Sequence, residues 1–244
     1  MVRAGMRRYR VRTTEQASLI GGSHRDERGQ LDFAQVFGEA GPVRLEIGFG
    51  HGEFLSQMAA SHPRERFVGV DYDELRATKT AHKSLKLDAR NLRLFTDEAH
   101  RFVRFRLPPA SLSRCYILFP DPWPKTGHRR RRLMNRSFLI DVTRAVMPGG
   151  RLIIASDTHG YALQALSNLT TIPGAWRNLY APNGYRIDIP TRFPTTFETH
   201  KKSEGCTICY LLFERTAAAA PEPVPWRGAL ADDDGDAGDD AADG

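Results

Sequence analysis

The stretch Leu45-Glu46-Ile47-Gly48-Phe49-Gly50-His51-Gly52-Glu53 decides the fold, because it joins an apolar strand to a helix through three alternate glycines. Residues 43–49 have the apolar character of a buried strand, and residues 53–61 have the pattern of a helix. Glycine lets the backbone turn tightly and approach a ligand closely. The stretch therefore predicts the first unit of an α/β fold, with a ligand-binding loop between strand and helix.

The same alternation continues through the central part of the chain. We expect further strands at 66–72, 92–96, 114–119 and 152–156 and near 176–180 and 207–213, and further helices at 73–87, 98–105, 135–146 and 161–169. Strands that alternate with helices of about ten residues indicate an α/β protein with a doubly wound, mostly parallel sheet.

Charge divides the chain into three parts. Residues 217–244 contain seven Asp, one Glu and one Arg, a net charge of −7, whereas the whole chain carries +6, which leaves +13 on residues 1–216. Such a basic body favours a polyanionic partner. We therefore divide the chain into a basic N-terminal extension (1–42), an α/β domain (43–216) and an acidic tail (217–244). The Ala/Pro-rich and Asp/Gly-rich composition of the tail predicts disorder, and we expect it to aid solubility rather than to compete for the basic face.

The N-terminal extension carries arginines at positions 3, 7, 8, 10 and 12. Such a segment resembles either a transit peptide or a basic arm that binds nucleic acid. We favour the arm, because the segment continues without a cleavage-like break.

Composition also argues against several classes of protein. The apolar fraction of 41% fits a globular protein, and no apolar stretch approaches the roughly 20 residues of a membrane span. The three cysteines, at 115, 206 and 209, make neither a disulfide framework nor a zinc site, so we expect no metal and a reducing cytoplasm. Cys206 and Cys209 lie in an apolar run, where core packing is the better interpretation.

The glycine loop indicates the kind of ligand. A dinucleotide fingerprint would have its third glycine at position 53, where Glu53 would repel a pyrophosphate. A ligand without phosphates fits better. S-adenosylmethionine (SAM) is one, and Glu46 has the charge to complement its sulfonium and ammonium groups.

Carboxylates also stand at the ends of the second and third predicted strands. Asp71 has the position of an acid that accepts hydrogen bonds from ribose hydroxyls, and Asp97 has the position of one that reads an adenine amino group. The alternatives are helix N-caps for Asp71 and Asp97 and a surface charge for Glu46. The three acids together favour the cofactor site.

The stretch Phe119-Pro120-Asp121-Pro122-Trp123-Pro124-Lys125 follows the fourth predicted strand, and His128-Arg129-Arg130-Arg131-Arg132 comes next. Three prolines forbid a helix and keep this loop extended. We expect Asp121 to project from the carboxyl end of the strand, beside Trp123 and a dense positive patch. A carboxylate, a flat ring and four arginines indicate a site for a base carried on a polyanion.

These motifs closely resemble bacterial tRNA (guanine-N7-)-methyltransferases. Residues 45–52, 69–71 and 119–125, Ser156-Asp157 and Thr195-Thr196-Phe197-Glu198 occur in the order found in that family, over about residues 5 to 215. The resemblance implies a Rossmann-like SAM-dependent methyltransferase fold, with a mostly parallel seven-stranded sheet and an antiparallel last strand. It also implies methylation of a variable-loop guanosine of tRNA, at position 46. We expect the protein to be a monomer or weak homodimer in the cytoplasm.

The resemblance further implies roles for individual residues. Asp121 is expected to be catalytic, and the SAM-binding residues are expected to be Glu46, Gly48, Gly50, Gly52, Asp71, Asp97 and Asp121. The substrate contacts are expected to be Lys125, Asp157, Thr195, Thr196, Phe197 and Glu198. We expect Thr195 and Glu198 to lie on a proline-containing loop before the last strand. The chain departs from the family pattern at Asp71 (usually Glu), Thr196 (commonly Lys) and Gly127 (commonly Arg). The last two departures concern RNA contacts and leave the methyl-transfer residues unchanged.

The chemistry needs no general base, because guanine N7 already has a free lone pair. We expect Asp121 to stabilise the positive charge that develops on the base, Trp123 to stack on a flipped-out nucleotide, and Lys125 and the arginines at 129–132 to contact phosphates. Asp157 has the position to orient a base or a positive side chain, or alternatively to cap the next helix.

Three other interpretations differ in what they bind. A small-molecule methyltransferase would not need the basic body, and an RNA-binding module without SAM would not need the strand-end acids. A nicotinamide-linked oxidoreductase is disfavoured by Glu53.

Overall fold

An eight-stranded sheet forms the centre of the computed structural model, which describes residues 14–21, 29–123, 125, 128, 131–189 and 193–226. The strands are β1 (Val43–Ile47), β2 (Phe67–Asp71), β3 (Leu92–Thr96), β4 (Leu112–Leu118), β5 (Val146–Ser156), β6 (Trp176–Asn178), β7 (Arg186–Ile187) and β8 (Cys209–Arg215). Their order is β3-β2-β1-β4-β5-β8-β6, with β7 paired to β8. The first five strands are parallel, whereas β8 runs antiparallel to β5. The predicted doubly wound sheet with a late antiparallel strand is confirmed, and the two-residue β7 makes eight strands instead of seven.

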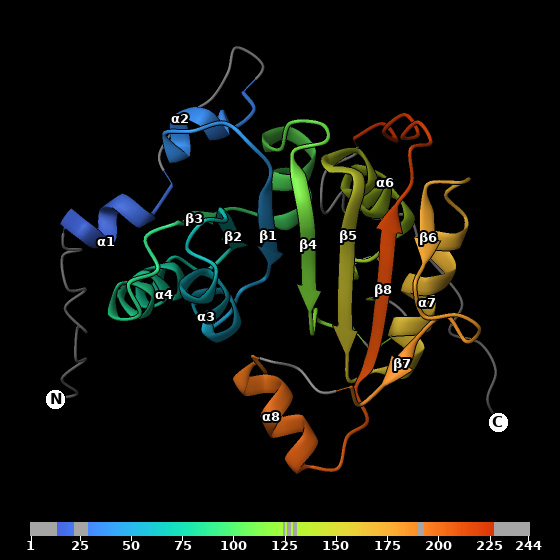
Figure 1. Ribbon diagram of the computed structural model, residues 1–244. Helices are drawn as coiled ribbons and strands as arrows, with labels where there is room; N and C mark the ends of the chain where they lie inside the picture. The colour runs from blue at the N-terminus through green and yellow to red at the C-terminus, as the bar shows by residue number, and fades with distance from the viewer. Residues whose placement is uncertain are drawn as a thin grey trace, which may run out of the picture.

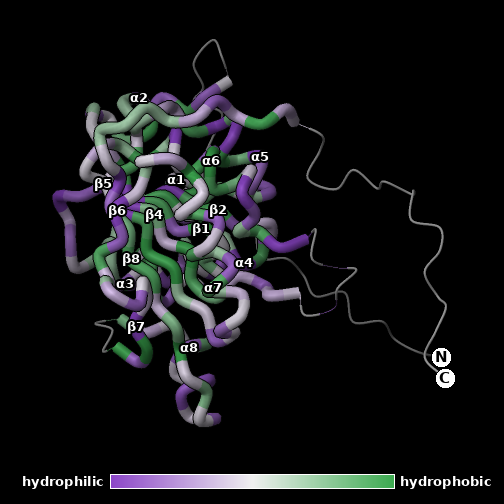
Figure 2. Tube along the Cα trace, turned by 90° about the vertical axis from the view of Figure 1, so that its right-hand side faces the viewer, coloured by the Kyte–Doolittle hydropathy of each residue, from purple (hydrophilic) through white to green (hydrophobic). Residues whose placement is uncertain are grey.

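Helices cover both faces of this sheet (Figure 1). They are α1 (Thr14–Leu19), α2 (Phe33–Phe37), α3 (Glu53–Ser61), α4 (Glu74–Lys86), α5 (Ala99–Arg101), the π-helical turn η1 (Phe102–Arg106), α6 (Arg136–Ala145), α7 (His159–Thr170) and α8 (Thr196–Ser203). One apolar cluster joins α1, α3 and α4 to β2 and β3, and a larger one joins α2, η1, α6 and α7 to the central strands. Figure 2 shows the hydrophobic segments gathered inside and hydrophilic ones around them.

The helix starts follow from the caps in the sequence. The Asp73 carboxylate accepts hydrogen bonds from the backbone amides of Leu75 and Arg76, and Asn135 accepts one from Phe138. These contacts satisfy amide groups that have no partner inside the helix. The helix predicted at 98–105 is instead a short α-helix that continues as a π-helical turn to Arg106.

Both chain segments that flank the predicted α/β domain contact it. Leu31, Phe33 and Val36 are part of the larger apolar cluster, although they belong to the predicted extension. Residues 217–226 of the predicted tail also contact the domain, since Arg104 Nη2 donates to the backbone oxygen of Val224 at 2.5 Å. Residues 1–13 and 227–244, which include the N-terminal arginines and all seven acidic-tail aspartates, lie outside the described residues.

Candidate active site

A cavity of about 630 Å³ opens at the carboxyl edge of the sheet. Its wall includes Gly48 after β1, Asp71 at the end of β2, Asp97 after β3 and Asp121 after β4. The chain order reverses here, because β1 lies between β2 and β4, and open α/β sheets bind ligands at such a point. The other lining residues are Ile47, Val70, Tyr72, Arg76, Glu98, Ala99, His100, Leu118, Phe119, Pro120, Trp123, Arg131, Arg132, Leu133 and Asn135.

The glycine loop between β1 and α3 has a backbone that favours glycine. Gly48, Gly50 and Gly52 have φ angles of +72°, +53° and +70°. A Cβ atom at Gly52 would also lie 2.3 Å from Cγ2 of Thr80 on α4, whereas one at Gly48 would meet nothing within 4 Å. Gly52 is therefore required for the packing of α4, and Gly48 leaves space open beside the cavity.

Asp71 holds the glycine loop. Its Oδ2 accepts a hydrogen bond from the amide of Gly50 at 2.9 Å, and its Oδ1 accepts one from the amide of Asp73 at 3.1 Å. Arg76 Nη1 lies 3.7 Å from Oδ2. The helix cap is Asp73, so the alternative that Asp71 caps α4 is wrong. Asp71 is a buried carboxylate that faces the cavity.

Asp97 occupies the third strand end. Its Oδ1 accepts hydrogen bonds from Arg101 Nε at 2.8 Å and from the amide of Glu98 at 2.9 Å. The carboxylate of Glu98, not that of Asp97, caps α5, so the cap alternative is wrong here too.

Glu46 is buried in the middle of the sheet, with 2% of its surface exposed. Burial raises the pKa of Glu46 well above its ordinary value, and the charges of Glu53 and Asp71 raise it further. Its Oε2 has no hydrogen-bond partner within the described part of the chain. The surface-charge alternative is therefore wrong. Oε2 of Glu46 is therefore a buried acceptor atom without a donor among the described residues; Glu46 precedes Ile47, which lines the cavity, but does not line the cavity itself.

The loop after β4 is held in an unusual backbone conformation. Phe119 and Trp123 have φ angles of +54° and +41°, a region that side chains rarely adopt and that is often found at functional sites. Arg132 fixes this loop, because its Nε donates to the backbone oxygen of Pro122 at 2.7 Å and its Nη1 donates to Gln164 at 2.6 Å. Arg132, which we expected to contact phosphates, thus makes structural hydrogen bonds.

The positive patch is described only in part. The Arg131 guanidinium lies 5.1 Å from the centre of the Trp123 ring, and the His128 ring meets the same ring edge to face. The Lys125 residue is exposed. Positions 124, 126, 127, 129 and 130 lie outside the described residues, so the predicted roles of Arg129 and Arg130 and the effect of Gly127 remain predictions.

The segment Thr195–Glu198, which we expected to be a loop, starts helix α8. Thr195 Oγ1 accepts a hydrogen bond from the amide of Glu198 at 2.9 Å and so caps the helix. Phe197 packs on Phe119 with ring centres 5.1 Å apart, which joins α8 to the loop of Asp121. Figures 1 and 2 both show α8 standing below the body of the sheet.

Asp157 and Glu198 attach this helix to the sheet. Lys201 Nζ lies 3.9 Å from Asp157 Oδ2, and Thr158 is the N-cap of α7, so the cap alternative for Asp157 is wrong. The buried Glu198 Oε1 accepts hydrogen bonds from Tyr210 Oη and Lys202 Nζ, both at 2.7 Å. Burial, together with the bond to Glu198, raises the pKa of Tyr210. Glu198 thus orients α8 from its buried side.

Three residues near the cavity had no role in our sequence interpretation. Arg76 was detectable, because a helix capped by Asp73 brings its third residue back toward Asp71. The His100 ring stacks on the Phe138 ring with ring centres 4.7 Å apart, and the centre of the Trp226 ring lies 6.0 Å from that of His100. Burial lowers the pKa of His100. No local pattern marks these two contacts, which join distant parts of the chain.

Neither a metal centre nor a membrane-spanning helix is found among the described residues. No group of three or more His, Cys, Asp or Glu side chains there is placed to hold a metal ion. The helices described include none with the length and apolar character needed to cross a membrane. All three cysteines are free; Cys115 and Cys209 are buried, whereas Cys206 is half-buried and precedes β8.

Comparison with known proteins agrees with this geometry. Residues 40–209 match the model of a family described as putative methyltransferase. The tRNA (guanine-N(7)-)-methyltransferase of Geobacter metallireducens is 34% identical over 78% of this chain and 89% of its own length. The enzyme of the same name from Bordetella pertussis is 36% identical over 76% of this chain and 72% of its own.

Solved structures support the fold alone. A variant of the 16S rRNA (adenine(1408)-N(1))-methyltransferase from Catenulisporales acidiphilia, solved with its cosubstrate SAM, has a TM-score of 0.56 at 18% identity, covering 79% of this chain and 95% of that one. The 16S rRNA methyltransferase KamB has a TM-score of 0.55 at 16% identity, covering 79% and 94%. From the family model and the sequence relatives together, this chain belongs to the tRNA (guanine-N(7)-)-methyltransferase family.

Proposed function

We propose that this protein transfers the methyl group of SAM to N7 of the guanosine at position 46, in the variable loop of tRNA. The observation that carries this proposal is the cavity, in which carboxylates from three strand ends meet Trp123 and Arg131. An acidic wall suits a cationic methyl donor, and a ring with a guanidinium suits a base carried on phosphates. Because tRNA is the acceptor, we place the reaction in the cytoplasm.

The acidic side of the cavity would hold the donor. SAM supplies an electrophilic methyl group on a sulfonium. The residues that would hold it are Glu46, Gly48, Gly50, Gly52, Asp71, Asp97 and Asp121. Two features support the fit: Glu46 Oε2 has no donor within the described residues, and an ammonium would provide one, while the open space at Gly48 leaves room beside the cavity.

Asp121 would act on the reacting base. Guanine N7 attacks through a lone pair that carries no proton, so the step requires no general base. The base becomes positively charged as the bond to the methyl carbon forms and the bond to sulfur breaks. A fixed carboxylate stabilises that charge without reorganising. The loop held by Arg132 keeps Asp121 at the cavity, and this positioning lets its charge act on the transition state.

The other side of the cavity would bind the RNA. Lys125 and Arg131 are exposed cations beside Trp123, and Phe197 continues this surface onto α8 through its contact with Phe119. We assign tRNA contacts to Lys125, Asp157, Thr195, Thr196 and Phe197, with Glu198 supporting the helix from within.

The direct test is product analysis. Unmodified tRNA is incubated with wild-type protein and SAM, and the digested nucleosides are identified by mass spectrometry. The proposal predicts N7-methylguanosine as the methylated product. Methylation of another nucleoside, or of none by protein that binds both SAM and tRNA, would contradict it.

A further inference from the structure

A second cavity, of about 600 Å³, opens beside the start of α7. Its lining residues are His159, Asn183, Tyr185, Arg186, Ile187, Ile189 and Thr207. His159 follows Asp157 by two residues, so their Cα atoms lie within about 7.6 Å of each other. The cavity therefore adjoins the carboxyl end of β5, next to Asp157, to which we assign a tRNA contact.

The lining groups are those that recognise nucleobases. The rings of His159 and Tyr185 meet edge to face, with centres 5.1 Å apart. The Arg186 guanidinium lies 4.9 Å from the centre of the Tyr180 ring. Aromatic faces and guanidinium planes stack on unpaired bases, and the amide of Asn183 offers both a donor and an acceptor for a base edge.

The wall of this cavity is held in place by the sheet. Arg186 and Ile187 form β7, which pairs with Tyr210 and Cys209 of β8. Asp188 and Ile208 exchange two hydrogen bonds, from the amide of Asp188 to the oxygen of Ile208 and from the amide of Ile208 to Asp188 Oδ1, each at 2.9 Å. A wall fixed before binding loses little conformational freedom when a ligand enters.

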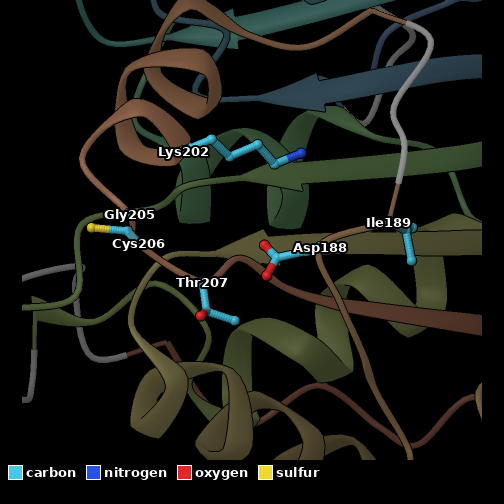
Figure 3. A pocket seen from close by; sticks show the side chains of 6 residues that line it. All are labelled: Asp188, Ile189, Lys202, Gly205, Cys206 and Thr207. Atoms are coloured by element: carbon cyan, nitrogen blue, oxygen red, sulfur yellow. The ribbon is translucent and has the colours of Figure 1, made fainter.

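This cavity shares lining residues with a smaller one of about 350 Å³, whose lining side chains Figure 3 shows. Ile189 and Thr207 line both cavities. The smaller one reaches Lys202 of α8, whose amine is already bound to Glu198 at 2.7 Å. The two adjoining cavities thus extend from Lys202 of α8 to β7, where the half-buried Tyr185 and the exposed His159 and Arg186 lie.

We propose that the cavity of His159, Tyr185 and Arg186 binds an unstacked nucleoside of the tRNA other than the methylated guanosine. The inference rests on the proposed function, because it takes tRNA as the substrate. Arg186 adds a positive charge for the adjoining phosphate. A second nucleoside held here fixes the register of the RNA while the target base occupies the first cavity.

The test measures tRNA binding, SAM binding and methylation for variants of the full chain. We expect Tyr185→Ala to raise the Kd for tRNA by about 5- to 150-fold, the loss typical of one stacked base, and to leave SAM affinity unchanged. Tyr185→Phe keeps the ring and should bind as the wild type does. Because Tyr185 also packs against the core, His159→Ala provides an independent, exposed variant with the same expected direction.

Arg177 provides a control for the loss of positive charge in Arg186→Ala. Arg177 is exposed, pairs with Glu214 and lies at the other end of β8, so Arg177→Ala removes the same charge away from the cavity. We expect Arg186→Ala to weaken tRNA binding more than Arg177→Ala does. Ultraviolet cross-linking of the wild-type complex should place a nucleotide on the peptide that contains Tyr185.

Each outcome separates this inference from the proposed function. If the wild type methylates tRNA but His159→Ala and Tyr185→Ala bind it within twofold of wild type, the nucleoside site is refuted and the proposed function stands. If the wild type binds SAM and methylates no tRNA, the proposed function fails, and the inference fails with it.

Discussion

Gly52→Ala tests how tightly the glycine loop is packed. Gly52 has a φ of +70°, and an added Cβ would lie 2.3 Å from Thr80 Cγ2 and 2.8 Å from Thr80 Cβ. The left-handed backbone costs an alanine about 1–2 kcal/mol, and overpacking a buried contact costs about 1–3 kcal/mol. We therefore expect the substitution to lower the free energy of unfolding by about 2–5 kcal/mol, because neither α3 nor α4 can move away without disturbing the sheet.

The assay is equilibrium unfolding in urea, with Gly149→Ala as the matched control. Gly149 has a φ of +78° and nothing within 4 Å of an added Cβ, so its replacement should cost only the backbone part, about 1–2 kcal/mol. Adding Thr80→Ala to Gly52→Ala should recover part of the loss, because it removes Cγ2 and Oγ1 from the clash. An equal loss for Gly52→Ala and Gly149→Ala would refute the packing argument.

Four further predictions concern chemistry, pH, the C-terminal segment and salt. Asp121→Asn should slow single-turnover methyl transfer by about 5- to 1000-fold. This corresponds to losing ~1–4 kcal/mol of stabilisation between two charges about 4 Å apart, the carboxylate and the methylated base. A wild-type rate that rises tenfold per pH unit would instead indicate a general base. Because the pKa of Glu46 is raised in the folded state, the folded state binds more protons than the unfolded state. The free energy of unfolding should therefore fall as the pH rises from the ordinary pKa of 4.5 through the raised pKa. Glu46→Gln should flatten this fall in urea titrations at several pH values. Trp226→Ala should lower the free energy of unfolding by about 1–3 kcal/mol, because the contacts of its ring with Phe105 and Arg104 are lost. No change would show that the Trp226 side chain does not stabilise the domain. Affinity for tRNA should fall at least about tenfold between 50 and 200 mM salt, as expected for several phosphate contacts, and a salt-independent Kd in filter binding would contradict the proposed basic surface.

The strand–helix alternation was predictable because each element carries its own signal. The helix at Glu53–Ser61 and the strand at Leu92–Thr96 were predicted with their observed bounds, since glycines or polar residues mark their ends. The reversal of the last long strand followed from the family resemblance and not from its apolar pattern, which is the same in either direction.

Helix α8 and strand β7 show why other elements were missed. Thr195 and Glu198 have the spacing of a capping box, a signal that was present but that we interpreted as a loop beside proline. By contrast, β7 has only two residues, and its pairing with β8 is a tertiary contact that its own sequence does not specify.

The cofactor acids were predictable for a topological reason. Parallel strands present their carboxyl ends at one edge, so Asp71, Asp97 and Asp121 had to meet there once the strands were identified. The roles of Arg132 and Trp226 were not predictable, because they depend on which backbone oxygens and rings the folded chain brings near them. An arginine in a basic run has the same sequence signature whether it binds phosphate or supports a loop.

The central claim is best tested with two tRNA transcripts and SAM that carries a labelled methyl group. One transcript has guanosine at position 46 in the variable loop, and the other has adenosine there and is otherwise identical. The account predicts label on the first transcript only, recovered as N7-methylguanosine and lost with Asp121→Ala. Equal labelling of both transcripts would remove the assignment to position 46, and no label on either, with SAM bound, would contradict the proposed reaction.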